Sequence, residues 1–169
     1  SLSDAGVPAE DKLFSTLDPV TRKISLSDNQ SFLLTDTVGF IQKLPPTLVA
    51  AFRATLEELE KADGILHVID ITHQNAPEQV QVVDKLLTEL HLEDKAKILV
   101  LNKIDLLLNQ GEGEEYIQRL QAELSQERVV TVSAAKEWGL DNLLNAIVKL
   151  LAHKSGHTND AIGFWANHP

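Results

Sequence analysis

Apolar positions along the chain form two kinds of segment, which predict a layered fold. Short runs rich in β-branched or aliphatic residues predict buried strands, and these are Phe32 to Leu34, Ile65 to Ile69, Ile98 to Leu101 and Val129 to Val132. Between them, apolar residues recur three or four positions apart and predict helices, with stripes at Leu48, Phe52, Leu56 and Leu59; Val80, Val83, Leu86, Leu87 and Leu90; Ile117, Leu120 and Leu124; and Leu140, Leu143, Leu144, Ile147 and Leu151. Strands that are apolar on both faces are typical of parallel sheets covered by helices on both sides. The pattern predicts a three-layer, doubly wound α/β fold with a mostly parallel sheet.

The segments at the two ends of this pattern are less regular. Lys23 to Leu26 is polar on one side and is joined to the Phe32 run by a short polar turn, which predicts an antiparallel hairpin at the edge of the sheet. The tail from Lys154 onward has no clear periodicity. We therefore expect one domain over residues 1–153 and a tail of unassigned structure over residues 154–169.

Composition and charge limit the classes of function. The chain has 169 residues, of which 43% are hydrophobic and 24% charged, as in one ordinary soluble domain. Its formal net charge of -10 works against non-specific attraction to nucleic acid or anionic membrane, so we expect no direct DNA binding and no membrane partner. It contains no cysteine, no apolar run long enough to span a bilayer and no signal-peptide pattern at its N-terminus. A cytoplasmic location follows as the simplest expectation.

Polar residues follow the Ile98 run at the point where ligands bind in open parallel sheets, the carboxyl ends of the strands. Here the sequence reads Asn102, Lys103, Ile104, Asp105. A carboxylate at Asp105 could accept two hydrogen bonds, from a ring N–H and an exocyclic amine, and of the two common purines only guanine offers that pair. Lys103 would lay its alkyl stem along the base plane, and Asn102 would tie neighbouring loops together.

A second polar turn follows the next strand. Ser133, Ala134 and Ala135 come directly after the Val129 run, and a backbone N–H of this turn could meet the guanine carbonyl. An N-K-x-D tetrapeptide alone is also compatible with polar residues that merely cap a strand. The two motifs in successive strands together favour a guanine site.

The third candidate follows the Phe32 run, where the sequence reads Asp36, Thr37, Val38, Gly39. A carboxylate at a strand end can hold a hydrated magnesium ion, and a glycine three residues later lets its N–H approach a terminal phosphate. Loss of that phosphate would release the loop, as in an order–disorder switch. A simple D-x-x-G turn would be the better interpretation if this motif stood alone.

Over residues 10 to 151 the chain resembles the HflX GTPases, within the translation-associated P-loop GTPases. The resemblance is carried by the three motifs above and by longer stretches that general GTPase motifs would not predict, namely "DKLFSTLDPVTRK" at 11–23, "DTVGFIQKLPPTLVAAFRATLEEL" at 36–59 and "ADGILHVIDITH" at 62–73. It implies a P-loop GTPase fold, GTP and GDP as ligands, and Mg²⁺ as cofactor. It also implies a nucleotide-switched factor that binds the large ribosomal subunit and splits or rescues ribosomes.

The resemblance adds a loop that spacing alone would not single out. Thr16 matches the switch I threonine, which senses magnesium and the terminal phosphate, although by itself it would be taken for a capping residue in a surface loop. The same loop would bring further residues near the nucleotide: Phe14, Ser15, Leu17 and Asp18. Asp36 and Gly39 take the switch II roles. The implied metal ligands are Thr16 and Asp36, the latter through water.

One element of the family pattern does not occur in this sequence. The phosphate loop, a G-x-x-x-x-G-K-[ST] run, lies in the family directly before the segment that begins here at Ser1. Without its charge-assisted bonds, each contributing about 1.5–3 kcal/mol, GTP binding would weaken by several orders of magnitude. We therefore expect the chain to be a fragment, inactive alone, of a full-length GTPase. The strand preceding that loop lies in the family between the strands that end at Asp36 and Asp70, so we expect two unpaired apolar edges there.

Two readings of function stay open. The first is the GTP-binding domain of a ribosome-associated GTPase; the second is a truncated, non-hydrolysing pseudo-G domain that retains only guanine contacts or a protein-binding surface. A dinucleotide-binding oxidoreductase is set aside because its glycine fingerprint is absent from the sequence. Phe40 stands where Ras-like GTPases carry a water-orienting glutamine. Its aromatic ring predicts slow intrinsic hydrolysis that depends on a partner or an ion.

Overall fold

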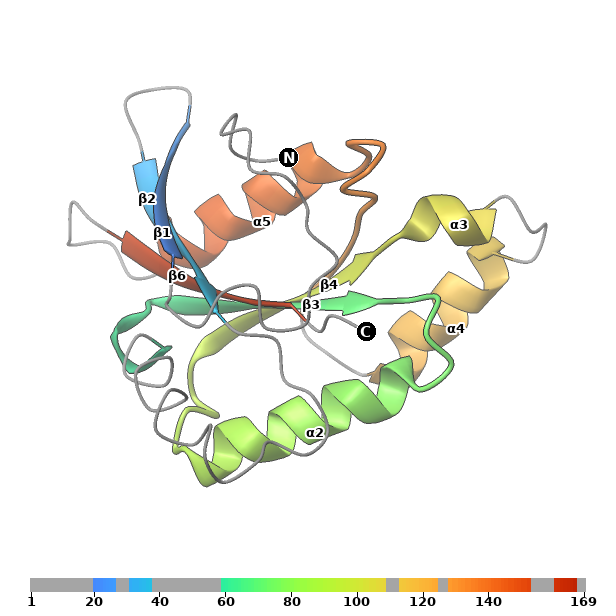
Figure 1. Cartoon of the computed structure of the whole chain (residues 1–169), viewed down its shortest axis with the longest axis horizontal. Helices are drawn as coiled ribbons and strands as arrows, with labels where there is room; N and C mark the ends of the chain where they lie inside the picture. Colours follow the sequence, from blue (N-terminus) through green and yellow to red (C-terminus); the bar gives the residue numbers. More distant parts are fainter. Residues whose placement is uncertain are drawn as a thin grey trace.

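A computed structural model describes residues 20–26, 31–37, 59–108, 113–124, 128–152 and 160–166. In chain order the elements are β1 (Val20–Ser25), β2 (Ser31–Thr37), β3 (Gly64–Asp70), α2 (Ala76–Glu89), β4 (Ala96–Asn102), α3 (Ile104–Leu108), α4 (Gly113–Leu124), β5 (Val129–Thr131), α5 (Leu140–Ala152) and β6 (Asp160–Ala166). The strands form one sheet in the order β1-β2-β6-β3-β4-β5 (Figure 1).

The sheet is parallel apart from one edge. β1 pairs with β2 in antiparallel register from Val20 opposite Asp36 to Ser25 opposite Ser31, which confirms the predicted hairpin. The pairs β2–β6, β6–β3, β3–β4 and β4–β5 are all parallel. The carboxyl ends of β2 to β6 therefore face the same edge of the sheet, as the predicted doubly wound fold requires.

The centre of the sheet is occupied by a strand from the C-terminal tail. β6 lies between β2 and β3, with Ile162 in register with both Leu34 and Gly64. The expectation that the facing edges of β2 and β3 stay unpaired is wrong. Unpaired edge N–H and C=O groups are ready partners for any extended segment, and β6 satisfies both edges while burying Ile162 to 1% exposure.

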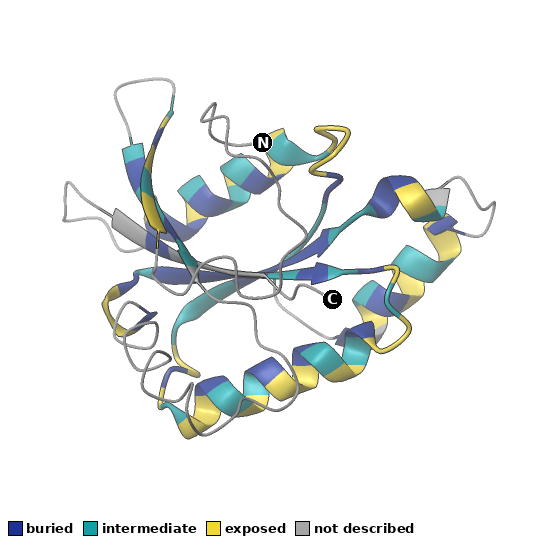
Figure 2. Cartoon of the chain, in the orientation of Figure 1, coloured by how far each residue is buried: buried dark blue, intermediate teal, exposed yellow. Residues whose placement is uncertain are grey.

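Helices cover both faces of the sheet, which confirms the three layers. α5 lies on one face, and α2 and α4 lie on the other (Figure 1). In Figure 2 the buried positions of these helices lie on the side that meets the sheet. The core under α5 is built from large apolar residues of the strands and the helix, including Phe32, Leu66, Ile98, Ile147 and Leu150. The opposite core joins Ile69, Leu99, Leu101, Val80 and Leu120.

The predicted helical stripes account for the buried helix positions where these are described. In α2 the buried residues include Val80, Val83 and Leu87, and in α5 they include Leu143 and Ile147. Of the first predicted stripe only Leu59, which is fully buried, falls within the described residues. Within the described part of the chain, no helix is both long enough and apolar enough to cross a membrane.

Candidate nucleotide-binding site

The N-K-x-D and S-A-A motifs lie at one edge of the sheet, at the carboxyl ends of β4 and β5. Asp70 and Asn102 are the last residues of β3 and β4 and stand in register with one another. The short helix α3 begins at Ile104, and its first N–H donates to the carbonyl of Val132 at 3.3 Å. The chain after β4 is thereby fastened to the chain after β5.

The Asn102 side chain joins the two loops. Its Oδ1 accepts hydrogen bonds from the backbone N–H of Lys103 at 2.8 Å and of Ala134 at 3.0 Å. This confirms the prediction that Asn102 ties neighbouring loops together. Because one oxygen serves both backbones, the positions of the two loops are coupled.

Asp105 and Ser133 form a buried pair beneath these loops. The Ser133 hydroxyl is fully buried and donates to Asp105 Oδ1 at 2.6 Å, while the Lys136 N–H donates to the same hydroxyl at 3.1 Å. Asp105 is 8% exposed, and its Oδ2 accepts no hydrogen bond from the described residues. The carboxylate is thus fixed through one oxygen and keeps acceptor capacity on the other.

The Ser133 loop is a tight turn closed by backbone bonds. Ser133 and Trp138 exchange two of them, at 3.0 and 3.1 Å. Gly139 follows with φ +74°, and a Cβ there would lie 2.3 Å from the carbonyl oxygen of Thr131, so the turn requires glycine. Within the described ranges, the N–H of Ala135 donates to no other group. It is an available donor in the turn that Ser133 ties to Asp105.

Lys103 is held from a neighbouring strand by an acid that sequence reasoning missed. Its Nζ lies 2.7 Å from Asp70 Oδ2, and its backbone has the left-handed φ of 69°. Burial raises the pKa of Asp70, but hydrogen bonds from Lys103 and Thr72 outweigh it and leave that pKa lowered. The available signal was positional: Asp70 ends the strand next to the N-K-x-D strand.

The structure sets Asp36 apart from this cluster. Asp36 is in register with Phe164 of β6, which is in register with Leu66 of β3. Asp36 therefore stands level with a residue four positions before Asp70, about 13 Å along the strand. Thr37 ends β2. The remaining predicted contacts lie outside the described residues, and these are Phe14, Ser15, Thr16, Leu17, Asp18, Val38 and Gly39, together with Phe40.

Metal-ligating residues do not cluster in the described ranges, where no group of three His, Cys, Asp or Glu side chains could hold an ion. Magnesium commonly binds through one or two carboxylates completed by waters and substrate phosphates. A single strand-end carboxylate such as Asp36 is compatible with that mode. It fits a magnesium ion shared with a nucleotide and does not form a metal cage of the protein alone.

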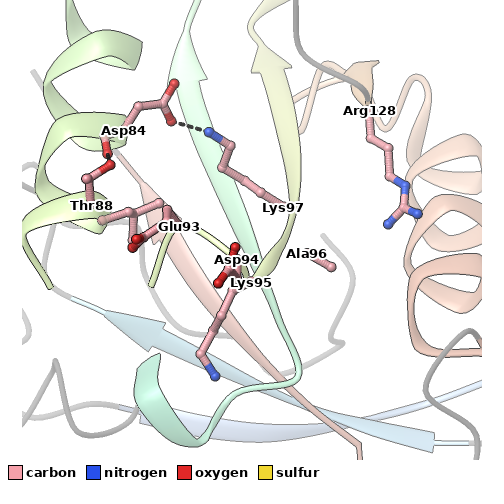
Figure 3. A pocket seen from close by; sticks show the side chains of 9 residues that line it. Asp84, Thr88, Glu93, Asp94, Lys95, Ala96, Lys97 and Arg128 are labelled. Carbon is pink, nitrogen blue, oxygen red and sulfur yellow. Dashed lines mark hydrogen bonds and ion pairs between the residues drawn. The ribbon is translucent and has the colours of Figure 1, made fainter. Parts of the chain in front are cut away.

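A separate cavity of about 470 Å³ lies at the opposite end of β4, around Ala96 (Figure 3). Three of its charged side chains are engaged within the protein. Lys97 is paired with Asp84, and Lys95 Nζ donates to the carbonyls of Glu60 and Ala62 at 2.6 and 2.7 Å. Those predicted nucleotide contacts that fall within the described residues do not line this cavity.

The parallel sheet, with N-K-x-D after one strand and S-A-A after the next, is the architecture of the P-loop GTPases. The chain belongs to the family of 50S ribosome-binding GTPases, whose model matches residues 1–103. It is 46% identical over 153 residues to the GTPase HflX of Lacrimispora saccharolytica, covering 90% of this chain and 34% of that protein. It is 44% identical over 151 residues to the GTPase HflX of Caldanaerobacter subterraneus subsp. tengcongensis, covering 89% and 32%. These similarities confirm the predicted resemblance to HflX GTPases.

A solved structure agrees with this assignment. The chain is similar to a GTP-binding protein from Sulfolobus solfataricus in complex with GDP, with a TM-score of 0.64 and 31% identity over 79% of this chain and 45% of that one. A second structure, the SsGBP and GDP complex, gives a TM-score of 0.66 at 31% identity over 82% and 44%. The chain spans about a third of the length of the curated relatives it matches.

Proposed function

We propose that the chain is the guanine-nucleotide-binding part of an HflX-type GTPase and that Asp105 reads the base. The observation that carries this proposal is the buried Ser133–Asp105 hydrogen bond of 2.6 Å, which orients the carboxylate while leaving Oδ2 as an acceptor. Asn102 holds the adjoining loops together through two further bonds. The carboxylate is therefore oriented before a ligand arrives, which lowers the entropic cost of binding.

Guanine matches these groups better than adenine does. Its ring N–H and exocyclic amine would donate to Asp105, and its carbonyl would accept from the N–H of Ala135. Adenine has an amine where guanine has that carbonyl and lacks the 2-amino group, so it would leave the carboxylate without donors. A hydrogen bond to a charged group contributes about 1.5–3 kcal/mol, or roughly a 10- to 150-fold ratio in affinity.

A series of nucleotides that differ only in the base tests this assignment. Competition of GDP, IDP and ADP against a fluorescent GDP measures the three affinities at one salt concentration. Hypoxanthine lacks only the 2-amino group of guanine, so IDP should bind more weakly than GDP and more tightly than ADP. Equal affinity for GDP and ADP would exclude guanine recognition by this site.

The phosphate and magnesium functions are the second part of the proposal. Asp36, together with Thr16, would hold Mg²⁺ through water and through nucleotide phosphates, and Gly39 would meet the terminal phosphate. The sequence contains no G-x-x-x-x-G-K-[ST] run, so we assign base recognition to this chain and GTP hydrolysis to the whole protein. Magnesium should tighten GDP binding by the wild type, and an Asp36→Ala variant should lose that dependence. A variant that keeps the full magnesium effect would remove Asp36 from the metal site.

The partner we propose for the whole protein is the large ribosomal subunit, in the cytoplasm. The support is the family description, 50S ribosome-binding GTPase, and the similarity to HflX GTPases over about 90% of the chain. That similarity does not favour the alternative, a truncated, non-hydrolysing pseudo-G domain that retains only guanine contacts or a protein-binding surface. Co-sedimentation of the whole protein with 50S subunits should be stronger with a non-hydrolysable GTP analogue than with GDP. Identical sedimentation with both nucleotides would contradict a nucleotide-controlled partner.

A further inference from the structure

Asp70 is a carboxylate at the strand-end edge whose two oxygens are both engaged. Its Oδ1 accepts from the N–H of Thr72 at 2.9 Å and from the Thr72 hydroxyl at 2.7 Å. Its Oδ2 lies 2.7 Å from Lys103 Nζ. The two oxygens therefore have different partners: Oδ1 stabilises the turn after β3, and Oδ2 forms an ion pair with the loop after β4.

Backbone contacts fix the distance between the two partners. Asp70 is in register with Asn102, and the N–H of Ile71 donates to the carbonyl of Asn102 at 3.1 Å. The backbone of Lys103 is left-handed, and its N–H donates to Asn102 Oδ1. A non-glycine residue keeps such a backbone only where its surroundings enforce it. Lys103 is therefore restrained at its backbone by Asn102 and at its ammonium by Asp70.

The ion pair between Lys103 and Asp70 is partly exposed, so a large contribution to folding stability does not explain it. The Lys103 side chain is 43% exposed and the Asp70 side chain 15% exposed. Ion pairs with an exposed partner contribute little to stability. What this one does provide is order, because lysine has four rotatable side-chain bonds and the ion pair removes most of their freedom before any ligand binds.

We propose that Asp70 is a positioning residue that holds the Lys103 ammonium, so that the alkyl stem of Lys103 stands ready to cover one face of the guanine base. This inference rests on the proposed function. Immobilising a side chain of this kind on binding reduces affinity by about 2- to 12-fold. Asp70 removes that penalty in advance without touching the nucleotide.

A double-mutant cycle separates positioning from a general structural role. Asp70→Asn keeps an acceptor for both Thr72 donors and removes the charge, while Lys103→Met removes the ammonium and keeps an unbranched stem. Each single variant should weaken GDP binding by about 2- to 12-fold, and the double variant should bind no more weakly than Lys103→Met. Losses that multiply in the double variant, or an unchanged affinity in Asp70→Asn, would overturn the inference. Glu78→Gln, with the same change of charge in the first turn of α2, is the matched control and should bind GDP as the wild type does.

A nucleotide-free measurement checks the ion pair directly. Acylation of lysines, followed by mass spectrometry, should modify Lys103 faster in Asp70→Asn than in the wild type, with the exposed Lys136 as internal reference. Equal Lys103 rates in both proteins would overturn the inference. Failure of the whole wild-type protein to bind GDP would overturn the proposed function and the positioning role together, whereas GDP binding that Asp70→Asn leaves unchanged in the whole protein would overturn the positioning role alone.

Discussion

His67 lies in the middle of β3, fully buried, and neither ring nitrogen has a hydrogen-bond partner among the described residues. Along the strand it shares a face with Ile65 and Ile69, which pack against Val83 and Val80 of α2. Burial, and to a lesser extent the nearby charge of Lys97, lowers its pKa to about 3. The folded protein therefore holds this ring neutral at every pH at which it is ordinarily handled.

The consequence is a loss of stability in mild acid. An exposed histidine in the unfolded chain has a pKa of about 6.5, so between pH 6.5 and pH 3 the unfolded state binds a proton that the folded state does not. Stability is fully present above pH 6.5 and falls as the pH drops. The linkage relation gives a loss of about 2 kcal/mol at pH 5 relative to pH 8. This figure depends on the unfolded pKa and is insensitive to the folded pKa while that stays below about 4.

Urea unfolding of the wild type and of His67→Leu at pH 8 and pH 5 isolates this effect. Leucine has a similar volume and no titratable group, so carboxylates that titrate over the same range cancel in the comparison. The wild type should lose about 2 kcal/mol more than the variant between the two pH values. At pH 8 the variant should be as stable as the wild type or more so, because it removes two unsatisfied polar atoms. Equal losses in the two proteins would refute the reasoning.

Three further substitutions test the site and the sheet, each by urea unfolding. Asn102→Ala removes the acceptor shared by two backbone N–H groups and should lower the free energy of unfolding by about 1–3 kcal/mol. Asn102→Asp keeps that acceptor and should retain most of the wild-type stability. Gly139→Ala should cost at least about 1–2 kcal/mol from its left-handed backbone alone, and wild-type stability would contradict the tight turn. Ile162→Ala should cost about 2–5 kcal/mol if β6 fills the centre of the sheet; a change below 0.5 kcal/mol, ordinary for surface sites, would contradict that placement.

The parallel sheet and its helices could be predicted because the information is local. Stripes such as Val80, Val83 and Leu87 specify which side of a helix is buried, whatever covers it. β6 could not be predicted in this way. Seven residues without a distinctive pattern become a strand because the edges of β2 and β3 are available, and those edges belong to segments distant in sequence. The short helix α3 was missed because its five residues are fewer than a periodic pattern needs.

Some residues of the candidate site could likewise be identified from local sequence, and others could not. Asn102 and Asp105 could be singled out because both belong to a short motif at the carboxyl end of a strand. The contribution of Asp70 depends on the register of β3 against β4, which places it opposite Asn102 and within reach of Lys103. The sequence does not state that register. For His67 the sequence predicted a place within a strand, but the lack of a partner emerged only from the packing around it.

The central claim, that Asp105 recognises a guanine base, is tested most directly by replacing one of its carboxylate oxygens with an amide NH2 group. Asp105→Asn keeps Oδ1 as acceptor for Ser133 and turns the other position into a donor. Xanthine carries a carbonyl where guanine carries its 2-amino group, so the donor now matches xanthine. Titration of both proteins with GDP and XDP should show the wild type preferring GDP and Asp105→Asn preferring XDP. The same order of affinities in both proteins would contradict the account.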